Sequence, residues 1–234
     1  MVSIAENLRS VMERIRAAES RAGKPEGSVT LMGVVKTRTP EQIATLVDAG
    51  VTCLGENRIQ EAEDHLDALP GVLLSPCRLH FIGRLQSNKA RKAVKLFHSI
   101  DSIDSEKLVR RADRICGEET LTREVMLEVN TGGEAQKGGI VPKEARELAA
   151  LVKECPHLTL TGLMTVPPFL ENAEACRPYF AELRSLFEAI ADDGAGPAFR
   201  HLSMGMTHDM EVAVEEGATM VRVGTALFGP RRTP

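Results

Sequence analysis

Two short segments near the end of the chain carry residues that suit phosphate binding. Ser203 offers a hydroxyl and Gly205 an unhindered backbone just before an expected helix. Gly224 and Thr225 offer backbone N–H groups and a second hydroxyl after an expected strand. Backbone N–H groups at a helix start, with glycine permitting close approach, bind anions readily. Either segment alone is equally well explained by a turn glycine and a capping serine, but together they favour a phosphate site.

Arg222 lies two residues before Gly224 on the same expected strand, so the alternation of side chains predicts that both face the same side of the sheet. In the barrel predicted below, that side is the interior. A buried guanidinium needs a partner, because an unpaired buried charge is costly. Glu128, on another expected strand, is one candidate and would make Arg222 purely structural. The alternative is that Arg222 donates to a ring nitrogen or an anionic group of a ligand whose phosphate lies on Gly224 and Thr225.

Lys36 follows a run of apolar residues at 29–35, where a lysine is by frequency a plain surface residue. Burial at a barrel mouth and the neighbouring charge of Arg38 would favour the neutral amine, which attacks an aldehyde to form a Schiff base. A Schiff-base lysine near a phosphate site indicates a phosphorylated aldehyde. Pyridoxal 5′-phosphate fits, because its ring nitrogen would accept from Arg222. A barrel aldolase needs the same two features and stays open on these grounds.

The elements that must position these residues alternate along the chain. After an amphipathic helix that begins at a capping box of Ser3 and Glu6 and ends near Gly23, the patterns predict eight strands and seven helices. The strands lie near 29–35, 51–54, 78–82, 97–100, 123–129, 158–163, 200–202 and 219–223. The helices lie near 39–49, 57–68, 86–95, 104–116, 142–154, 172–191 and 207–216.

Eight largely apolar strands separated by helices predict an α/β fold, a (β/α)8 barrel that forms a single domain over 1–234. An open doubly wound sheet is the alternative, weakened because no G-x-G-x-x-G follows a strand. In a barrel, every strand ends at the face that carries the chemistry. This rim would gather Lys36, Asn57, His80 and Asp101 with the phosphate segments.

Five segments of the chain resemble the YggS/PROSC family of pyridoxal phosphate homeostasis proteins in order and spacing. They are VVKTRTPEQIATLVDAG, LGENRIQEA, LHFIGRLQSNKAR, LTGLMTV and SMGMTHDMEVAVEEGATMVRVGTALFG. The resemblance covers nearly the whole chain. It implies a fold-type III barrel, similar to the N-terminal domain of alanine racemase, that holds pyridoxal phosphate as a Schiff base on Lys36.

The resemblance also implies roles for individual residues. The phosphate would lie on Ser203, Gly205, Gly224 and Thr225; the pyridine nitrogen would face Arg222, with Asn57 beside the ring and His80 in the pocket. Two positions depart from the family. Arg38 stands where many relatives have a second lysine, which bears on transfer of the cofactor between amines. Arg58 stands where tyrosine is common, which bears on aromatic contact with the ligand.

Composition narrows the classes of partner. A net charge of −4 with interspersed signs gives no basic face for nucleic acid and no anchor for a membrane. The five cysteines are scattered without a C-x-x-C, so we expect neither a disulfide framework nor a metal site. We expect a cytoplasmic monomer, with pyridoxal phosphate and apo pyridoxal phosphate enzymes as its partners.

Two functions follow from the resemblance. The first is a carrier, buffer or regulator of pyridoxal phosphate without robust catalysis, and the second is a small amino-acid racemase. A racemase of this fold needs an acid/base on each face of the substrate adduct, and in similar two-domain enzymes the second is a tyrosine. The sequence has one tyrosine, Tyr179, in the expected helix after the sixth strand. Apart from this question, Lys137 lies in a glycine-rich loop on the rim and is a candidate for ligand contact, whereas His208 and Asp209 suit the start of the helix after the phosphate segment.

Overall fold

The computed structural model describes residues 3–134 and 136–230 and contains a closed barrel of parallel strands. The strands are paired in chain order from β1 to β8, and β8 pairs back with β1. Their bounds are β1 Thr30–Val34, β2 Cys53–Glu56, β3 Arg78–Phe81, β4 Ser99–Ile103, β5 Arg123–Glu128, β6 Leu158–Met164, β7 His201–Ser203 and β8 Met220–Val223. The (β/α)8 barrel is confirmed, and the doubly wound sheet is wrong.

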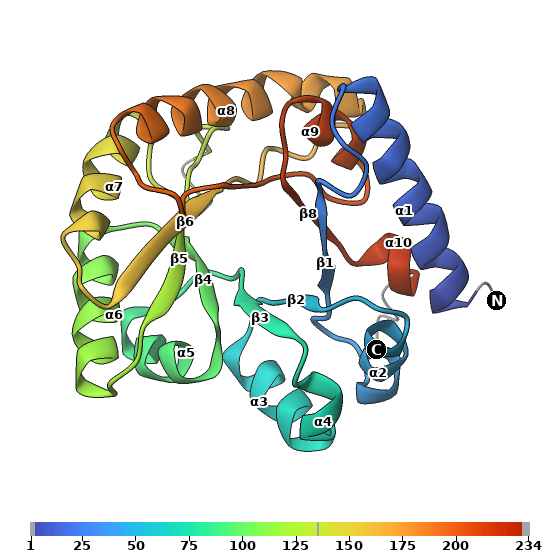
Figure 1. Ribbon diagram of the computed structural model, residues 1–234, viewed down its shortest axis with the longest axis horizontal. Coiled ribbons are helices and arrows are strands. Elements are labelled where there is room, and N and C mark those ends of the chain that lie inside the picture. Colours follow the sequence, from blue (N-terminus) through green and yellow to red (C-terminus); the bar gives the residue numbers. More distant parts are fainter. Residues whose placement is uncertain (1–2, 135, 231–234) are drawn as a thin grey trace.

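Helices surround the strands (Figure 1). The α-helices are α1 Ile4–Arg21, α2 Pro40–Asp48, α3 Ile59–Ala68, α4 Gly71–Leu74, α5 Ala90–Leu96, α6 Glu106–Glu118, α7 Ala145–Lys153, α8 Arg177–Asp192, α9 Met210–Glu215 and α10 Thr225–Phe228. Short 3-10 helices precede three of them: η1 Ser87–Lys89, η2 Pro142–Glu144 and η3 Ala173–Cys176. The sequence patterns missed α4 and α10, which are too short to show a helical period.

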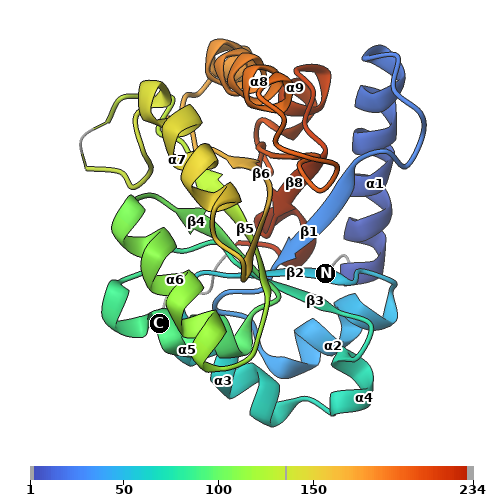
Figure 2. The same cartoon turned by 60° about the vertical axis from the view of Figure 1, so that its left-hand side comes forward.

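The first helix packs against the end of the chain. Its capping box is formed as expected, with Ser3 Oγ accepting from the N–H of Glu6 at 3.2 Å and the Glu6 carboxylate accepting from the N–H of Ser3 at 2.7 Å. One face of α1 buries Leu8, Val11 and Ile15. Helix α1 packs against α9 and α10 (Figure 1) and runs alongside β1 (Figure 2), so it covers the seam where the barrel closes.

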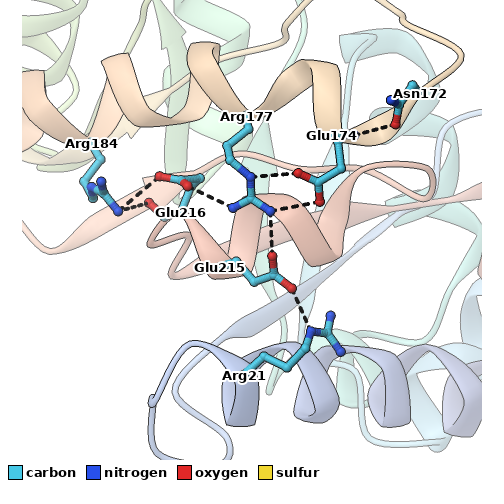
Figure 3. A network of polar contacts seen from close by, with 7 residues as sticks. All are labelled: Arg21, Asn172, Glu174, Arg177, Arg184, Glu215 and Glu216. Atoms are coloured by element: carbon cyan, nitrogen blue, oxygen red, sulfur yellow. Dashed lines mark hydrogen bonds and ion pairs between the residues drawn. The ribbon is translucent and has the colours of Figure 1, made fainter.

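A network of ions joins three helices on this side of the molecule (Figure 3). Arg177, at the start of α8, binds the carboxylates of Glu174, Glu215 and Glu216 at 2.7–2.9 Å. Glu215 also accepts from Arg21 at the end of α1, at 2.7 Å. A shared network holds its side chains in place better than an isolated surface pair does, so it fixes α1 and α9 relative to α8.

The barrel has two apolar regions. The larger one lies between the strands and the surrounding helices and includes Leu46, Ile100 and Phe180, all fully buried. The smaller one is formed by four buried residues with sulfur-containing side chains: Met32, Cys53, Met126 and Met220. Flexible methionines fill an irregular space well, which suits a barrel interior that also holds polar groups.

The fourth strand differs from its predicted position. It spans Ser99–Ile103 instead of 97–100, so Asp101 lies within β4 and is fully buried rather than at the rim. The Asp101 carboxylate accepts from Ser99 Oγ at 2.5 Å and contacts His80 Nδ1 at 2.9 Å. A charged residue in a strand is a poor strand signal. Here its hydrogen bonds compensate for its burial.

Three further observations concern the whole described chain. All five cysteines are buried free thiols. No helix within 3–134 and 136–230 is both long enough and apolar enough to cross a bilayer. Over the same residues, no three His, Cys, Asp or Glu side chains are grouped so that they could hold a metal ion.

Candidate functional site

A cavity of about 370 Å³ opens at the carboxyl ends of the strands. Its walls come from β1 and β8 and from the segments that follow β1, β2, β3, β6, β7 and β8. The lining residues are Val34, Lys36, Arg38, Asn57, Ile82, Gly83, Val166, Phe169, Met206, Thr207, His208, Arg222, Gly224 and Thr225. The cavity therefore joins a primary amine, a guanidinium, two hydroxyls and a glycine backbone, from segments almost 190 residues apart in the printed sequence.

Lys36 occupies a tight turn between β1 and α2. The turn is closed by a hydrogen bond from Arg38 N to Val35 O at 3.1 Å. Thr37 adopts a left-handed conformation with φ 61°, which is unfavourable for a β-branched residue. Its N–H donates to the Glu61 carboxylate at 2.8 Å. The strained turn thus depends on contacts with α3 to hold the lysine at the cavity.

The side chains of Glu56, which is buried, and His65, which is partly buried, support the same turn. His65 Nε2 lies 2.9 Å from Arg38 O, and His65 Nδ1 lies 2.7 Å from Glu56 Oε1. Burial raises the pKa of the Glu56 carboxyl, and the hydrogen bond with Glu56 raises the pKa of His65. Both hydrogen bonds form when one proton lies between His65 Nδ1 and Glu56 Oε1 and a second is carried by His65 Nε2. The Nε2–H then donates to Arg38 O.

Replacing His65 with phenylalanine is expected to destabilise the protein through this pair. Phenylalanine keeps the ring shape but removes the hydrogen bonds that His65 makes with Glu56 Oε1 and Arg38 O, at a cost of about 1–3 kcal/mol. Because the folded pKa of His65 is raised, its stabilisation is complete below its unfolded value of about 6.5 and is lost as pH rises through the folded value. Urea unfolding of parent and variant across this pH range measures the difference.

Two control variants separate the pair from general effects. Glu56→Gln should keep a hydrogen bond to a neutral His65 and flatten the pH dependence. His157→Phe removes a half-exposed histidine that contacts Asp113 at 3.2 Å and should cost under about 1 kcal/mol. If the difference between His65→Phe and the parent grew with increasing pH, the shared-proton account of the pair would be wrong.

Arg222 lies in the wall of the cavity and is almost fully buried. Its Nη1 donates to Ser203 O at 2.6 Å and to Ser203 Oγ at 2.8 Å, and its Nη2 donates to Thr165 O at 2.7 Å. Burial lowers the pKa of Arg222, opposed by the charges of Asp101 and Glu128. The Arg222 side chain is therefore oriented by the carbonyl and hydroxyl of Ser203 in β7 and by the carbonyl of Thr165, which follows β6. Its Nε takes no part in these three hydrogen bonds.

The two predicted phosphate segments lie next to one another but contribute differently. Gly224 and Thr225 line the cavity, and Ala226 N donates to Thr207 Oγ1 at 3.2 Å, which joins the start of α10 to the loop after β7. A Cβ on Gly224 would come 3.2 Å from Val34 O. Gly205 has φ +91°, and a Cβ there would lie 2.5 Å from the Ala213 Cβ, so packing against α9 requires glycine.

His80 lies inside the barrel, where its side chain contacts Asp101. Burial alone disfavours its charged form, but the charge and hydrogen bond of Asp101 raise the pKa of His80 well above its usual value. An imidazolium paired with a buried carboxylate is a structural unit of the interior. His80 is not among the residues that line the cavity.

The structure thus brings Lys36, Asn57, Arg222, Gly224 and Thr225 together around one cavity. Ser203 reaches it only through Arg222, and Gly205 acts through the backbone of the β7–α9 loop. Arg38 and His208 also line the cavity, whereas Lys137 donates to Pro167 O at 3.0 Å in a neighbouring loop.

Several residues around the cavity were missed or underrated by sequence reasoning. Thr207 carries a hydroxyl next to an expected glycine segment and could have been found by its position. Phe169, 80% exposed at the rim, contacts His208 with ring centroids 5.5 Å apart and the ring planes tilted by 41°. Glu56 and His65 gave no signal, because their contact with the Lys36 turn depends on how α3 packs.

Comparison with known proteins identifies relatives of this chain. Residues 6–232 match the family model described as alanine racemase, N-terminal domain. The pyridoxal phosphate homeostasis protein of Aquifex aeolicus (strain VF5) is 42% identical over 231 residues, which cover 99% of this chain and 100% of that protein.

Two solved structures agree closely with the barrel. A crystal structure of a protein from Bifidobacterium adolescentis has a TM-score of 0.91 and 37% identity, and the match covers 96% of this chain and 94% of that one. The structure of PipY from Synechococcus elongatus PCC7942 with PLP bound has a TM-score of 0.81 and 35% identity, covering 97% and 100%.

Proposed function

This chain belongs to the alanine racemase N-terminal domain family and to its pyridoxal phosphate homeostasis branch, and we propose that it binds pyridoxal 5′-phosphate to maintain the cofactor's supply in the cell. The observation that carries the proposal is one cavity at the strand ends that joins Lys36, Arg222, Gly224 and Thr225. The two solved structures named above share the barrel fold over 94% and 100% of their chains.

The residues around the cavity fit this cofactor. The cavity volume of about 370 Å³ lies within the range of small-ligand sites. Lys36 supplies the amine, and Thr207, Thr225 and the backbone at Gly224 are suited to a phosphate. A side chain at Gly224 would crowd Val34 O, so close packing against the end of β1 favours glycine here. The donor set therefore matches a phosphorylated aldehyde.

Each residue has a distinct part in the proposal. Pyridoxal phosphate supplies an aldehyde that condenses with a primary amine, and Lys36 is the amine. Gly224 and Thr225 hold the phosphate with Gly205 shaping the loop beside them, and Asn57 contacts the ring. Arg222, oriented by Ser203, donates to the ring nitrogen. His80 supports the interior of the barrel beneath the site.

The position of Arg222 favours a carrier over a racemase. A guanidinium cannot give up its proton at physiological pH, so a ring nitrogen that accepts from it stays unprotonated and withdraws electrons weakly. Tyr179, the one tyrosine, lies in α8 on the outer ring of helices and does not line the cavity. A racemase remains the second candidate, because the fold is that of alanine racemase N-terminal domains.

An assay with two arms tests the function. The loaded protein is mixed with an apo form of an unrelated pyridoxal phosphate enzyme, and recovered activity is followed with and without an aldehyde-trapping agent. We expect recovery in both cases for direct transfer, and recovery that the trap abolishes for a buffer. In deuterated water with single-enantiomer amino acids, turnover at about 1–1000 per second would instead establish a racemase.

The remaining parts of the proposal concern organisation. We propose that the barrel is a single domain over 1–234 and acts as a monomer, with apo-enzymes as recipients of its cofactor. The cytoplasm is proposed as its compartment, in line with five thiols that are all buried and unbridged.

A further inference from the structure

A second concavity lies on the same rim, at the carboxyl ends of β2, β3 and β4. Its volume is about 1020 Å³, and its lining includes Asn57, which also lines the cofactor cavity. The two sites also meet along the chain, because Gly83 lines the cofactor cavity and Arg84 lines the groove. We call this concavity the RLQSNK groove, after residues 84–89, all of which line it.

The groove is positively charged in an acidic protein. Four cations line it (Arg58, Arg84, Lys89 and Lys92) against two carboxylates. Lys92 pairs with Glu63 at 2.8 Å, and Arg58 pairs with Glu61 at 3.0 Å. Within the described residues no ion pair involves Arg84 or Lys89, and both are exposed. Asp104, the second carboxylate of the lining, lies beside them, and the four cations and two carboxylates leave the groove with a net positive charge.

The polar residues between these cations suit an oxyanion. Gln86, Ser87 and Asn88 line the groove beside Arg84 and Lys89, and they supply amide and hydroxyl donors. A guanidinium binds phosphate through two parallel donors, and a lysine adds a mobile point charge. The volume suffices for a phosphomonoester with its water. The proposed role of the neighbouring cavity explains none of these residues.

We propose that the RLQSNK groove is a second anion site that binds phosphomonoesters beside the cofactor cavity. This proposal rests on the proposed function in one respect: we infer that the bound phosphomonoesters are phosphorylated vitamers, which the groove collects from solution and holds next to Lys36. Its positive potential raises the local concentration of such anions at the mouth. The site is open and polar, so binding is weaker and more salt-dependent than in the cavity.

Titration with phenyl phosphate tests the groove apart from the cavity. The protein is loaded with pyridoxal phosphate and reduced with borohydride, so that the cavity is covalently filled, and binding is measured by calorimetry. We expect saturable binding of one equivalent that inorganic phosphate displaces. The double variant Arg84→Ala/Lys89→Ala should weaken binding by roughly tenfold or more, because it removes both charge-assisted contacts.

A matched control is the double variant Lys107→Ala/Lys143→Ala, which removes two exposed lysines outside the groove. It should change the affinity by less than about twofold. Absence of binding to the reduced protein, or an equal loss in both double variants, would overturn the proposal. If no cofactor adduct forms, the proposed function fails, while the Arg84/Lys89 dependence measured on unloaded protein still decides the groove.

Discussion

Lys36→Ala protein is expected to lose all cofactor that borohydride can fix, and with it the visible absorbance of the loaded parent. The physical reason is that Lys36 is the one lysine among the residues that line the cavity. The strained turn at Thr37 places its amine there. Noncovalent contacts to the phosphate and the ring remain in the variant, so weak, reversible binding should persist. Absorbance before and after gel filtration, with phosphate analysis, measures both.

Lys107→Ala, on the exposed face of α6, is the control for this experiment and should load like the parent. Retention of reducible cofactor in Lys36→Ala, at the parent's stoichiometry, would mean that another amine does the chemistry. Weak binding that also vanishes would instead mean that Lys36 contributes to more than the covalent link.

Arg222→Met is expected to weaken cofactor binding by roughly 10–150-fold, which corresponds to a charge-assisted hydrogen bond of about 1.5–3 kcal/mol. The same change removes the donor from Ser203 Oγ and Thr165 O, both inside the protein. Loss of those contacts costs about 1–3 kcal/mol of the free energy of unfolding, partly offset because a buried charge is removed as well. Urea unfolding and cofactor titration measure the two effects separately.

Two variants make this prediction specific. Arg222→Lys keeps a positive charge and three donors, so it should recover most of the lost free energy of unfolding. An ammonium group cannot reproduce the planar arrangement of the two guanidinium Nη atoms, so the cofactor spectrum should stay altered. Arg200→Met removes an exposed arginine just before β7 and should leave both quantities unchanged. Parent-like cofactor affinity in Arg222→Met would contradict a contact between Arg222 and the ring.

The barrel was predictable from sequence because its signal is local. Apolar strand patterns and amphipathic helices repeat with their own periods, and the capping box of Ser3 and Glu6 fixed the start of α1. The failures have local causes as well. Asp101 interrupts the apolar pattern of β4, and α4 is shorter than two helical turns.

The cavity was predictable only in part. Lys36 and Arg222 stand out because each contradicts its local pattern, as a charge at the end of an apolar strand and a charge within one. Gly224 stands out only through its position next to a second glycine segment with the same features. Ser203 has the right type and position, but β7 turns its hydroxyl toward Arg222.

Contacts between elements left no comparable trace. The support of the Lys36 turn by Glu56 and His65 depends on how α3 packs beside β2. In the groove, Arg84, Lys89 and Lys92 lie close together in the sequence, but their meeting with Arg58 depends on tertiary packing. Side chains that meet only through tertiary packing carry no periodic signal in the sequence.

The most direct measurement of the central claim is peptide mass mapping of the parent protein after loading with pyridoxal phosphate and reduction with borohydride. The account predicts one cofactor per chain, carried by the peptide that contains Lys36, at the mouth of the cavity. A label on Lys89 in the groove or on Lys137 beside Pro167, with Lys36 unmodified, would contradict it.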